Sequence, residues 1–239
     1  MISLLVSLLF ALQPTHQETD NVQKYHVVLA DPPWPEKGGG KRGAQHKFDV
    51  MSIQQIKRVG APLEKHLADD CYLFMWVTNS FLEDWCPVVR DWGFRPLTLL
   101  TWVKEEVGLG QYTMGQTEHM VLAVRGSPGY FIQPDGSKYR IRTCLGGDKL
   151  KSPRGPDGNR IHSAKPPEVM HILEQALRGT PGPYLELFAR KRFSDNWHIW
   201  GNQVDSDIDL ELPFEQFGFD FLHSAQVEHN PYLENENEK

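Results

Sequence analysis

Short apolar runs of strand length recur along the chain and are separated by polar stretches rich in glycine and proline. Cys71–Val77 is apolar throughout, which predicts a strand buried on both faces, as in a parallel sheet. Tyr25–Ala30 is a shorter apolar run that ends at a proline-rich loop. We expect strands at Tyr25–Ala30, Cys71–Val77, Pro96–Val103, Glu118–Arg125, Tyr184–Phe188 and Trp197–Trp200.

Capping residues and helix-ending glycines lie between several of these runs. They predict helices from Ser52 to Arg58, from Asn79 or Ser80 to Asp91, and from Pro166 to Arg178. Strands that alternate with helices predict an α/β fold: a doubly wound, mostly parallel, Rossmann-like sheet. In such sheets ligands bind at the carboxyl ends of the strands, where Asp31, Asn79 and Arg190 are expected.

Three stretches lack this pattern. Residues 37–47 are rich in glycine and lysine and predict an exposed loop. Residues 126–165 hold eight basic and three acidic residues, and a loop of that length is uncommon unless it is functional or disordered. Met1–Leu12 is nearly all apolar but carries no basic residue and no small-residue cleavage site, which argues against secretion. It is too short to span a bilayer, so we expect no membrane association.

The length of 239 residues suits one substantial α/β domain. Residues 204–239 hold ten acidic residues and one lysine, which leaves 24 basic and 21 acidic residues in 1–203. The slightly basic body permits nucleic-acid binding without arguing for it. We divide the chain into an apolar extension (1–22), a folded domain (23–204) and an acidic, partly disordered tail (205–239). Three widely spaced cysteines argue against a zinc site or a disulfide framework and suit a reducing compartment.

The segment Val27–Trp34 carries the most specific chemistry, because a strand delivers Asp31 into Pro32-Pro33-Trp34. The exocyclic amine of adenine is a poor nucleophile, since its lone pair is delocalised into the ring. Two acceptors placed against its two N–H groups would localise that lone pair. An ionised Asp31 accepts only, and the Pro32 carbonyl can be the second acceptor.

The two prolines fix φ and add no N–H donors, so the acceptors are held where charge develops. Trp34 offers a flat apolar face on which a flipped-out base can stack. The structural alternative is a rigid turn followed by a core tryptophan. We assign catalytic roles to Asp31, Pro32, Pro33 and Trp34.

From about Tyr25 to Gln203 the chain resembles the N6-adenine methyltransferases that include the catalytic subunit of the eukaryotic messenger-RNA adenosine methylase and its bacterial and phage relatives. The shared motifs occur in the same order, with the catalytic loop ahead of the cofactor motifs. They are Asp31–Trp34, Leu73–Thr78, Thr101–Lys104, Glu118-His119, Val124–Gly126, His162–Pro166, Glu186–Arg190 and Gly201–Gln203. The resemblance implies a methyltransferase domain with this permuted order, and S-adenosyl-L-methionine as cofactor.

The resemblance also implies roles for single residues. Asp31 would lie near the cofactor, Lys165 would pair with its methionine carboxylate, and Glu186 would accept from its ribose hydroxyls. Phe188 and Arg190 would lie beside them, with Asn202 and Gln203 bonded to the ribose and adenine side. We assign substrate binding to Trp34, Lys41, Arg42, Phe48, Asn79, Glu118, Arg160 and His162.

Departures from the family pattern are also visible. Phe48 stands where many relatives have a tyrosine, and Gln13 and Pro14 occupy the distance at which eukaryotic members clasp the cofactor adenine. The zinc fingers of eukaryotic members are absent from this sequence. The basic loops 37–47 and 138–165 are therefore our candidates for backbone contacts with nucleic acid.

Two other functions stay open from the sequence. A cytosine-amine methyltransferase needs the same acceptor geometry but usually has Ser in place of Asp31. A silent scaffold that binds RNA or a partner typically loses the Asp or a Pro of the loop. The short domain inclines us to DNA over RNA, in the cytoplasm or, for a eukaryote, the nucleus. A dimer with itself or with a related subunit remains open.

Overall fold

The computed structural model describes residues 22–35, 50–108, 112–161 and 163–212. A seven-stranded sheet has the order β7-β3-β4-β2-β1-β8-β9. Every neighbouring pair is parallel except β2–β4 and β3–β4, so β4 alone runs against the rest. The bounds are β1 Tyr25–Ala30, β2 Leu67–Val77, β3 Arg95–Lys104, β4 Thr117–Arg125, β7 Cys144–Leu150, β8 Tyr184–Leu187 and β9 Trp197–Trp200. The predicted mostly parallel α/β sheet is confirmed.

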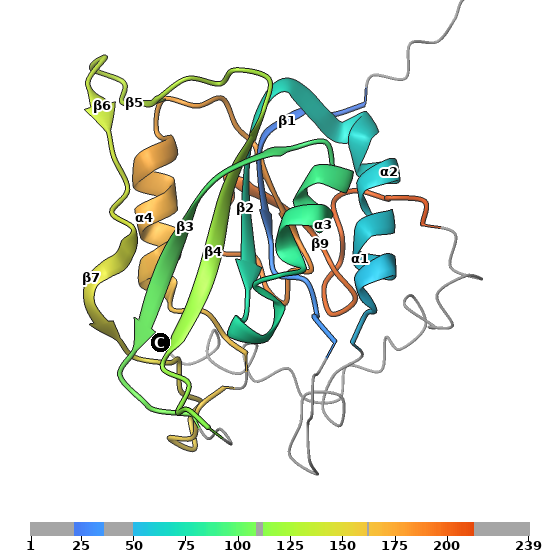
Figure 1. The fold of residues 1–239 in the computed structure, drawn as a ribbon. Helices are drawn as coiled ribbons and strands as arrows, with labels where there is room; N and C mark the ends of the chain where they lie inside the picture. Colours follow the sequence, from blue (N-terminus) through green and yellow to red (C-terminus); the bar gives the residue numbers. More distant parts are fainter. Residues whose placement is uncertain (1–21, 36–49, 109–111, 162, 213–239) are drawn as a thin grey trace, which may run out of the picture.

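Helices cover both faces of this sheet (Figure 1). On one face lie α1 (Ile53–Arg58), α2 (Gly60–Leu63), the short 3-10 turn η2 (Glu64–His66) and α3 (Trp85–Asp91); on the other lies α4 (Pro167–Leu177). The central strands are buried by both layers, with Val28 and Val27 of β1 in opposite hydrophobic clusters. Val169 and Leu173 of α4 belong to the cluster around Val27, since a four-residue spacing keeps them on one helix face.

The start of α1 was predicted correctly. The Ser52 side chain accepts from the Gln55 amide, and the Gln55 side chain accepts from the Ser52 amide, which forms a capping box. The predicted start of the next helix is wrong. Asn79 begins a short 3-10 turn, η3 (Asn79–Phe81), and α3 starts only at Trp85. The Asn79 side chain instead binds β4, so it does not cap a helix.

Residues 126–165 contain more regular structure than the predicted long loop. A small hairpin pairs β5 (Phe131–Ile132) with β6 (Lys138–Tyr139), and β7 joins the edge of the main sheet beside β3. The Trp102 indole donates to the Leu150 carbonyl across that edge, at 3.1 Å. The segment that leads to α4 is therefore fixed to the same sheet that carries Asp31.

Part of the acidic segment 205–239 packs on the domain. Leu210 and Leu212 are buried in the cluster beneath α1 and α3, and Arg192 pairs with both carboxylate oxygens of Asp207 at 2.8 Å. Residues 213–239 and 1–21 lie outside the described residues. Within the described part, no helix is both long and apolar enough for a membrane span.

Candidate active site at the carboxyl edge of the sheet

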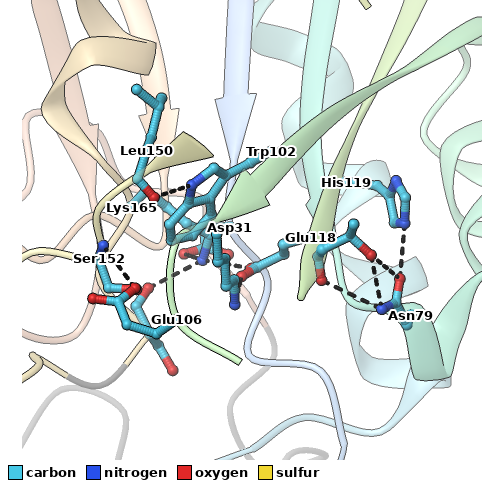
Figure 2. Close-up of polar contacts among 12 residues, drawn as sticks. Asp31, Asn79, Trp102, Glu106, Glu118, His119, Leu150, Ser152 and Lys165 are labelled. Atoms are coloured by element: carbon cyan, nitrogen blue, oxygen red, sulfur yellow. Dashed lines mark hydrogen bonds and ion pairs between the residues drawn. The ribbon is translucent and has the colours of Figure 1, made fainter. Parts of the chain in front are cut away.

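The predicted site residues converge because strand ends meet at one edge of the sheet. Asp31 follows β1, which runs parallel to its neighbours β2 and β8, so these three strands end together. Glu118 reaches the same edge at the start of β4, because that strand runs in the opposite direction. Lys165, in the segment that precedes α4, lies at this edge as well (Figure 2). This edge includes the topological switch point of the sheet, because β2 lies on one side of β1 and β8 lies on the other.

The catalytic loop is held by backbone hydrogen bonds. The Asp31 amide donates to the Leu187 carbonyl at 3.4 Å, and the Pro33 carbonyl accepts from the Met51 amide at 2.8 Å. The Pro32 carbonyl accepts from the Trp34 amide at 2.8 Å, which closes a tight turn. A carbonyl oxygen has two lone pairs, so the Pro32 oxygen keeps one for a further donor.

Trp34 does not present the open face that we expected. The side chain is only 7% exposed and stacks on Phe81, with ring centroids 5.5 Å apart. Its indole N–H donates to the Trp76 carbonyl at the end of β2, at 2.8 Å. In this structure the indole therefore fixes the loop to the sheet, as in the structural alternative, and a base cannot stack on it as it stands.

A chain of alternating charges crosses the edge. Lys165 Nζ lies 2.7 Å from Asp31 Oδ2 and 3.1 Å from Glu118 Oε1, and Lys104 Nζ lies 2.8 Å from Glu118 Oε2. The Lys165 ammonium also donates to the Ser163 carbonyl at 3.1 Å, so its three donors are all engaged. In Figure 2, Lys165, Asp31 and Glu118 lie close together at this edge. These two lysines and two carboxylates balance in charge.

Burial and pairing act in opposite directions on these groups. Burial raises the pKa of Asp31 above its ordinary value, although the Lys165 ammonium opposes the shift. Burial would also raise the pKa of Glu118, but Lys165 and Lys104 outweigh it and the pKa is lowered. Despite its burial, Lys165 has a raised pKa because both carboxylates favour its charged form. Lys165 and Glu118 are therefore held as ions.

The residues expected to hold a cofactor lie at the ends of β8 and β9. Burial, and next the charge of Asp31, raise the pKa of Glu186 to about 8. Phe188 has a positive φ of 63° and packs edge-on against Trp200. The Arg190 guanidinium donates to the Gln203 side chain at 3.2 Å, and Asn202 lies in the turn directly before. These side chains are gathered on the β8 and β9 side of Asp31.

The expected substrate residues are divided by the structure. Glu118 lies inside the charge chain, whereas Asn79 forms a separate polar cluster with His119 (2.7 Å) and the Thr117 hydroxyl (3.1 Å) (Figure 2). Arg160 is exposed on the segment between β7 and α4. The remaining expected substrate residues, Lys41, Arg42, Phe48 and His162, lie outside the described residues.

Lys104 was missed as a site residue. It closes the motif Thr101–Lys104, which had been recognised without a role for its lysine. The register of the β3–β4 hairpin, in which Trp102 opposes Glu118, identifies the partner of Lys104, and the sequence alone does not give that register. Lys104 is two residues beyond Trp102, so it lies on the same face and diagonal to Glu118.

No group of three or more potential metal ligands occurs among the described residues. All three cysteines are free thiols, with Cys71 buried and the other two partly buried. The chemistry available at this edge is therefore that of paired carboxylates, ammonium groups and backbone carbonyls.

Comparison with known proteins gives relatives that are methyltransferases by name. The chain is 28% identical over 211 residues to the type II methyltransferase M.MunI from a Mycoplasma species, covering 80% of this chain and 82% of that protein. It is 28% identical to the human N(6)-adenosine-methyltransferase catalytic subunit METTL3 and 27% identical to the human N(6)-adenine-specific methyltransferase METTL4. Those matches cover 81% and 75% of this chain, but only 31% and 37% of the human proteins.

The family model of MT-A70 matches residues 25–203, which extend from the first residue of β1 to the end of the Gly201-Asn202-Gln203 motif. This range holds the catalytic loop, the charge chain and the residues at the ends of β8 and β9. The expected resemblance is thereby confirmed, and the chain belongs to the MT-A70 family.

Proposed function

We propose that this chain methylates the N6 amine of adenine in DNA, with the Asp31 carboxylate and the Pro32 carbonyl as the groups that receive the amine. The coarser class is an adenine-N6 methyltransferase that uses S-adenosyl-L-methionine. One observation carries the assignment of the site. The Asp31 carboxylate lies at the end of β1, beside the Pro32 carbonyl and in an ion pair with a buried lysine.

The preference for DNA over RNA rests on the match to M.MunI, a type II methyltransferase by name from a Mycoplasma species. The alignment with M.MunI covers both proteins to about the same extent, 80% and 82%. The alignment with METTL3, an adenosine methyltransferase by name, covers only 31% of that protein. The matched domain thus corresponds to nearly the whole of this bacterial relative, which favours DNA.

The geometry of the loop supports two acceptors for one amine. Lys165 engages Asp31 Oδ2, which leaves Oδ1 for one N–H of the amine. The second lone pair of the Pro32 carbonyl is available for the other N–H. Lys165 also favours the ionised form of Asp31, and only that form accepts without donating. The nitrogen that accepts the methyl group becomes a positively charged, acidic ammonium, so its proton can leave to water and no side chain need act as a base.

The residues at this edge also fit the cofactor. Glu186 is a half-buried carboxylate with no hydrogen-bond donor among the described residues, and it can accept from two ribose hydroxyls. Phe188, Arg190, Asn202 and Gln203 would complete that side of the pocket. When bound, S-adenosyl-L-methionine supplies an electrophilic methyl group on a sulfonium.

Lys165 could pair with a cofactor carboxylate only by giving up a present contact, since its three donors are engaged. We expect the bond to the Ser163 carbonyl to be released, because it is the neutral one of the three.

The test is incubation with labelled cofactor and separate pools of single- and double-stranded DNA and RNA, followed by mass spectrometry of the nucleosides. We expect N6-methyladenine in a DNA pool and none with Asp31→Ala. Methylcytosine would instead identify a cytosine-amine enzyme. A folded protein that binds no cofactor would identify a silent scaffold, and methyladenine confined to RNA would overturn the preference for DNA.

A further inference from the structure

We propose that Lys104 is a positioning residue for methyl transfer, which acts through Glu118 to hold Lys165 against the catalytic carboxylate of Asp31. The inference rests on the proposed role of Asp31 and adds a residue that the proposed mechanism does not use. Among the described residues, the ion-pair partner of Lys104 is Glu118, and no ion pair joins Lys104 to Asp31 or to the groups proposed to hold the cofactor.

The register between β3 and β4 brings Lys104 close to Glu118. Trp102 of β3 opposes Glu118 of β4, and the Lys104 amide donates to the Gln116 carbonyl at 2.8 Å, which continues the ladder past Glu118. The backbone on both sides of the pair is thus fixed. The Lys104 ammonium also lies 4.7 Å from the centre of the Trp102 ring, a second contact that orients it.

Glu118 uses its two oxygens on two different lysines. Oε2 contacts Lys104 and Oε1 contacts Lys165, and the Glu118 side chain is only 9% exposed. A carboxylate pinned at one oxygen presents the other in a fixed direction. Lys165 in turn rests over the Trp76 ring at 5.2 Å and reaches Asp31 Oδ2. Each contact therefore orients the next one, from Lys104 through Glu118 and Lys165 to Asp31.

The same four side chains also affect one another through their charges. Without Lys104, the Glu118 carboxylate keeps a single cationic partner, and its unbalanced charge raises the pKa of Asp31. The charges of Lys165, Glu118 and Arg190 act on Asp31, and those of Lys165 and Lys104 act on Glu118. The charges of Asp31, Lys191 and Lys165 act on Glu186. Burial lowers the pKa of His119, and the neighbouring Glu118 carboxylate opposes that shift. Among the described residues, Lys165 and Lys104 are the cations that lower the pKa of Glu118, so the loss of Lys104 leaves Lys165 as the remaining one.

The experiment compares Lys104→Met and Lys104→Arg with wild type in kcat/KM against pH. Lys57→Met is the matched control, because Lys57 pairs with Asp91 at 3.1 Å on the α1–α3 face and is similarly exposed (22% against 26% for Lys104). We expect Lys104→Met to lose about ten-fold in kcat/KM and its acidic limb to rise by roughly one pH unit. Lys104→Arg and Lys57→Met should retain the wild-type profile.

A double-mutant cycle gives the decisive outcome. If Lys104 acts through Glu118, then Lys104→Met changes kcat/KM less than about two-fold in a Glu118→Gln background. An equal loss in both backgrounds would overturn the proposal. So would a raised KM for nucleic acid and a smaller salt dependence with an unmoved acidic limb, because these indicate direct contact with a phosphate.

A second measurement separates this proposal from the proposed function. Carboxyl carbon NMR reports the titration of Asp31 without any turnover. A wild type that methylates no pool would sink the proposed function alone. The positioning role of Lys104 would still be supported if its loss raises the titration midpoint of Asp31 by roughly one unit, and refuted if that midpoint is unchanged.

Discussion

Replacing Glu186 with glutamine should make the protein more stable at alkaline pH. Burial, and then the nearby charge of Asp31, raise the pKa of Glu186 to about 8 from its model-compound value of 4.5. Lys191 and Lys165 oppose this shift without cancelling it. Glutamine has nearly the same shape and cannot ionise, so the substitution removes the charge while keeping the packing.

The sign follows from proton linkage. The folded protein keeps the Glu186 proton up to about pH 8, whereas the unfolded chain releases it near 4.5. The folded state therefore binds more protons in this window, and the stability of the wild type falls as pH rises through it. The full shift corresponds to at most about 5 kcal/mol. Solvent reaches this partly buried side chain, so we expect about 2 to 3 kcal/mol.

The assay is urea unfolding of wild type and Glu186→Gln at pH 5 and pH 9. The two should differ little at pH 5, and the variant should be more stable at pH 9. Glu64→Gln is a control of opposite sign. The hydrogen bond from Arg125 lowers the Glu64 pKa, so this substitution should destabilise the protein to a similar extent at pH 5 and pH 9, both of which lie above that pKa. A Glu186→Gln difference that is the same at both pH values would refute the reasoning.

Two further substitutions test the packing around the site. Trp34→Phe and Trp92→Phe each remove an indole donor to a buried carbonyl, at 2.8 and 2.9 Å, so calorimetry should show similar losses of about 2 to 3 kcal/mol. Only Trp34→Phe should lose methyl transfer as well, and equal activity losses would contradict a loop-fixing role. Leu210→Ala should lose about 2 to 5 kcal/mol in urea unfolding, because Leu210 is fully buried. No loss there would mean that the segment after 204 is dispensable for stability.

Much of the fold could be predicted because local signals agreed with the tertiary structure. The all-apolar Cys71–Val77 lies within a central strand, and the Ser52 cap and its capping box start α1 as expected. β7 was missed because its sequence, with Gly146 and Gly147 at positive φ, lacks the pattern of a strand. It becomes a strand through pairing with β3, and no local signal reports such pairing.

The candidate site was likewise predictable only in part. Asp31 and Lys165 were named from motifs, but their 2.7 Å ion pair joins residues 134 positions apart, and no spacing in the sequence predicts it. The orientation of Trp34 depends on a contact with Phe81 and on the end of β2. Lys104 needed the β3–β4 register before its partner could be known. Residue types could thus be predicted, whereas partners required the sheet.

The most direct test of the account is single-turnover methyl transfer by Asp31→Asn at saturating cofactor and adenine-containing DNA. Asparagine keeps the size of the side chain and one acceptor oxygen, but it loses the negative charge and the ion pair with Lys165. We predict a transfer rate at least about 100-fold below wild type, with cofactor still bound and the fold intact by circular dichroism. Transfer at the wild-type rate would contradict the claim that the Asp31 carboxylate holds the reacting amine.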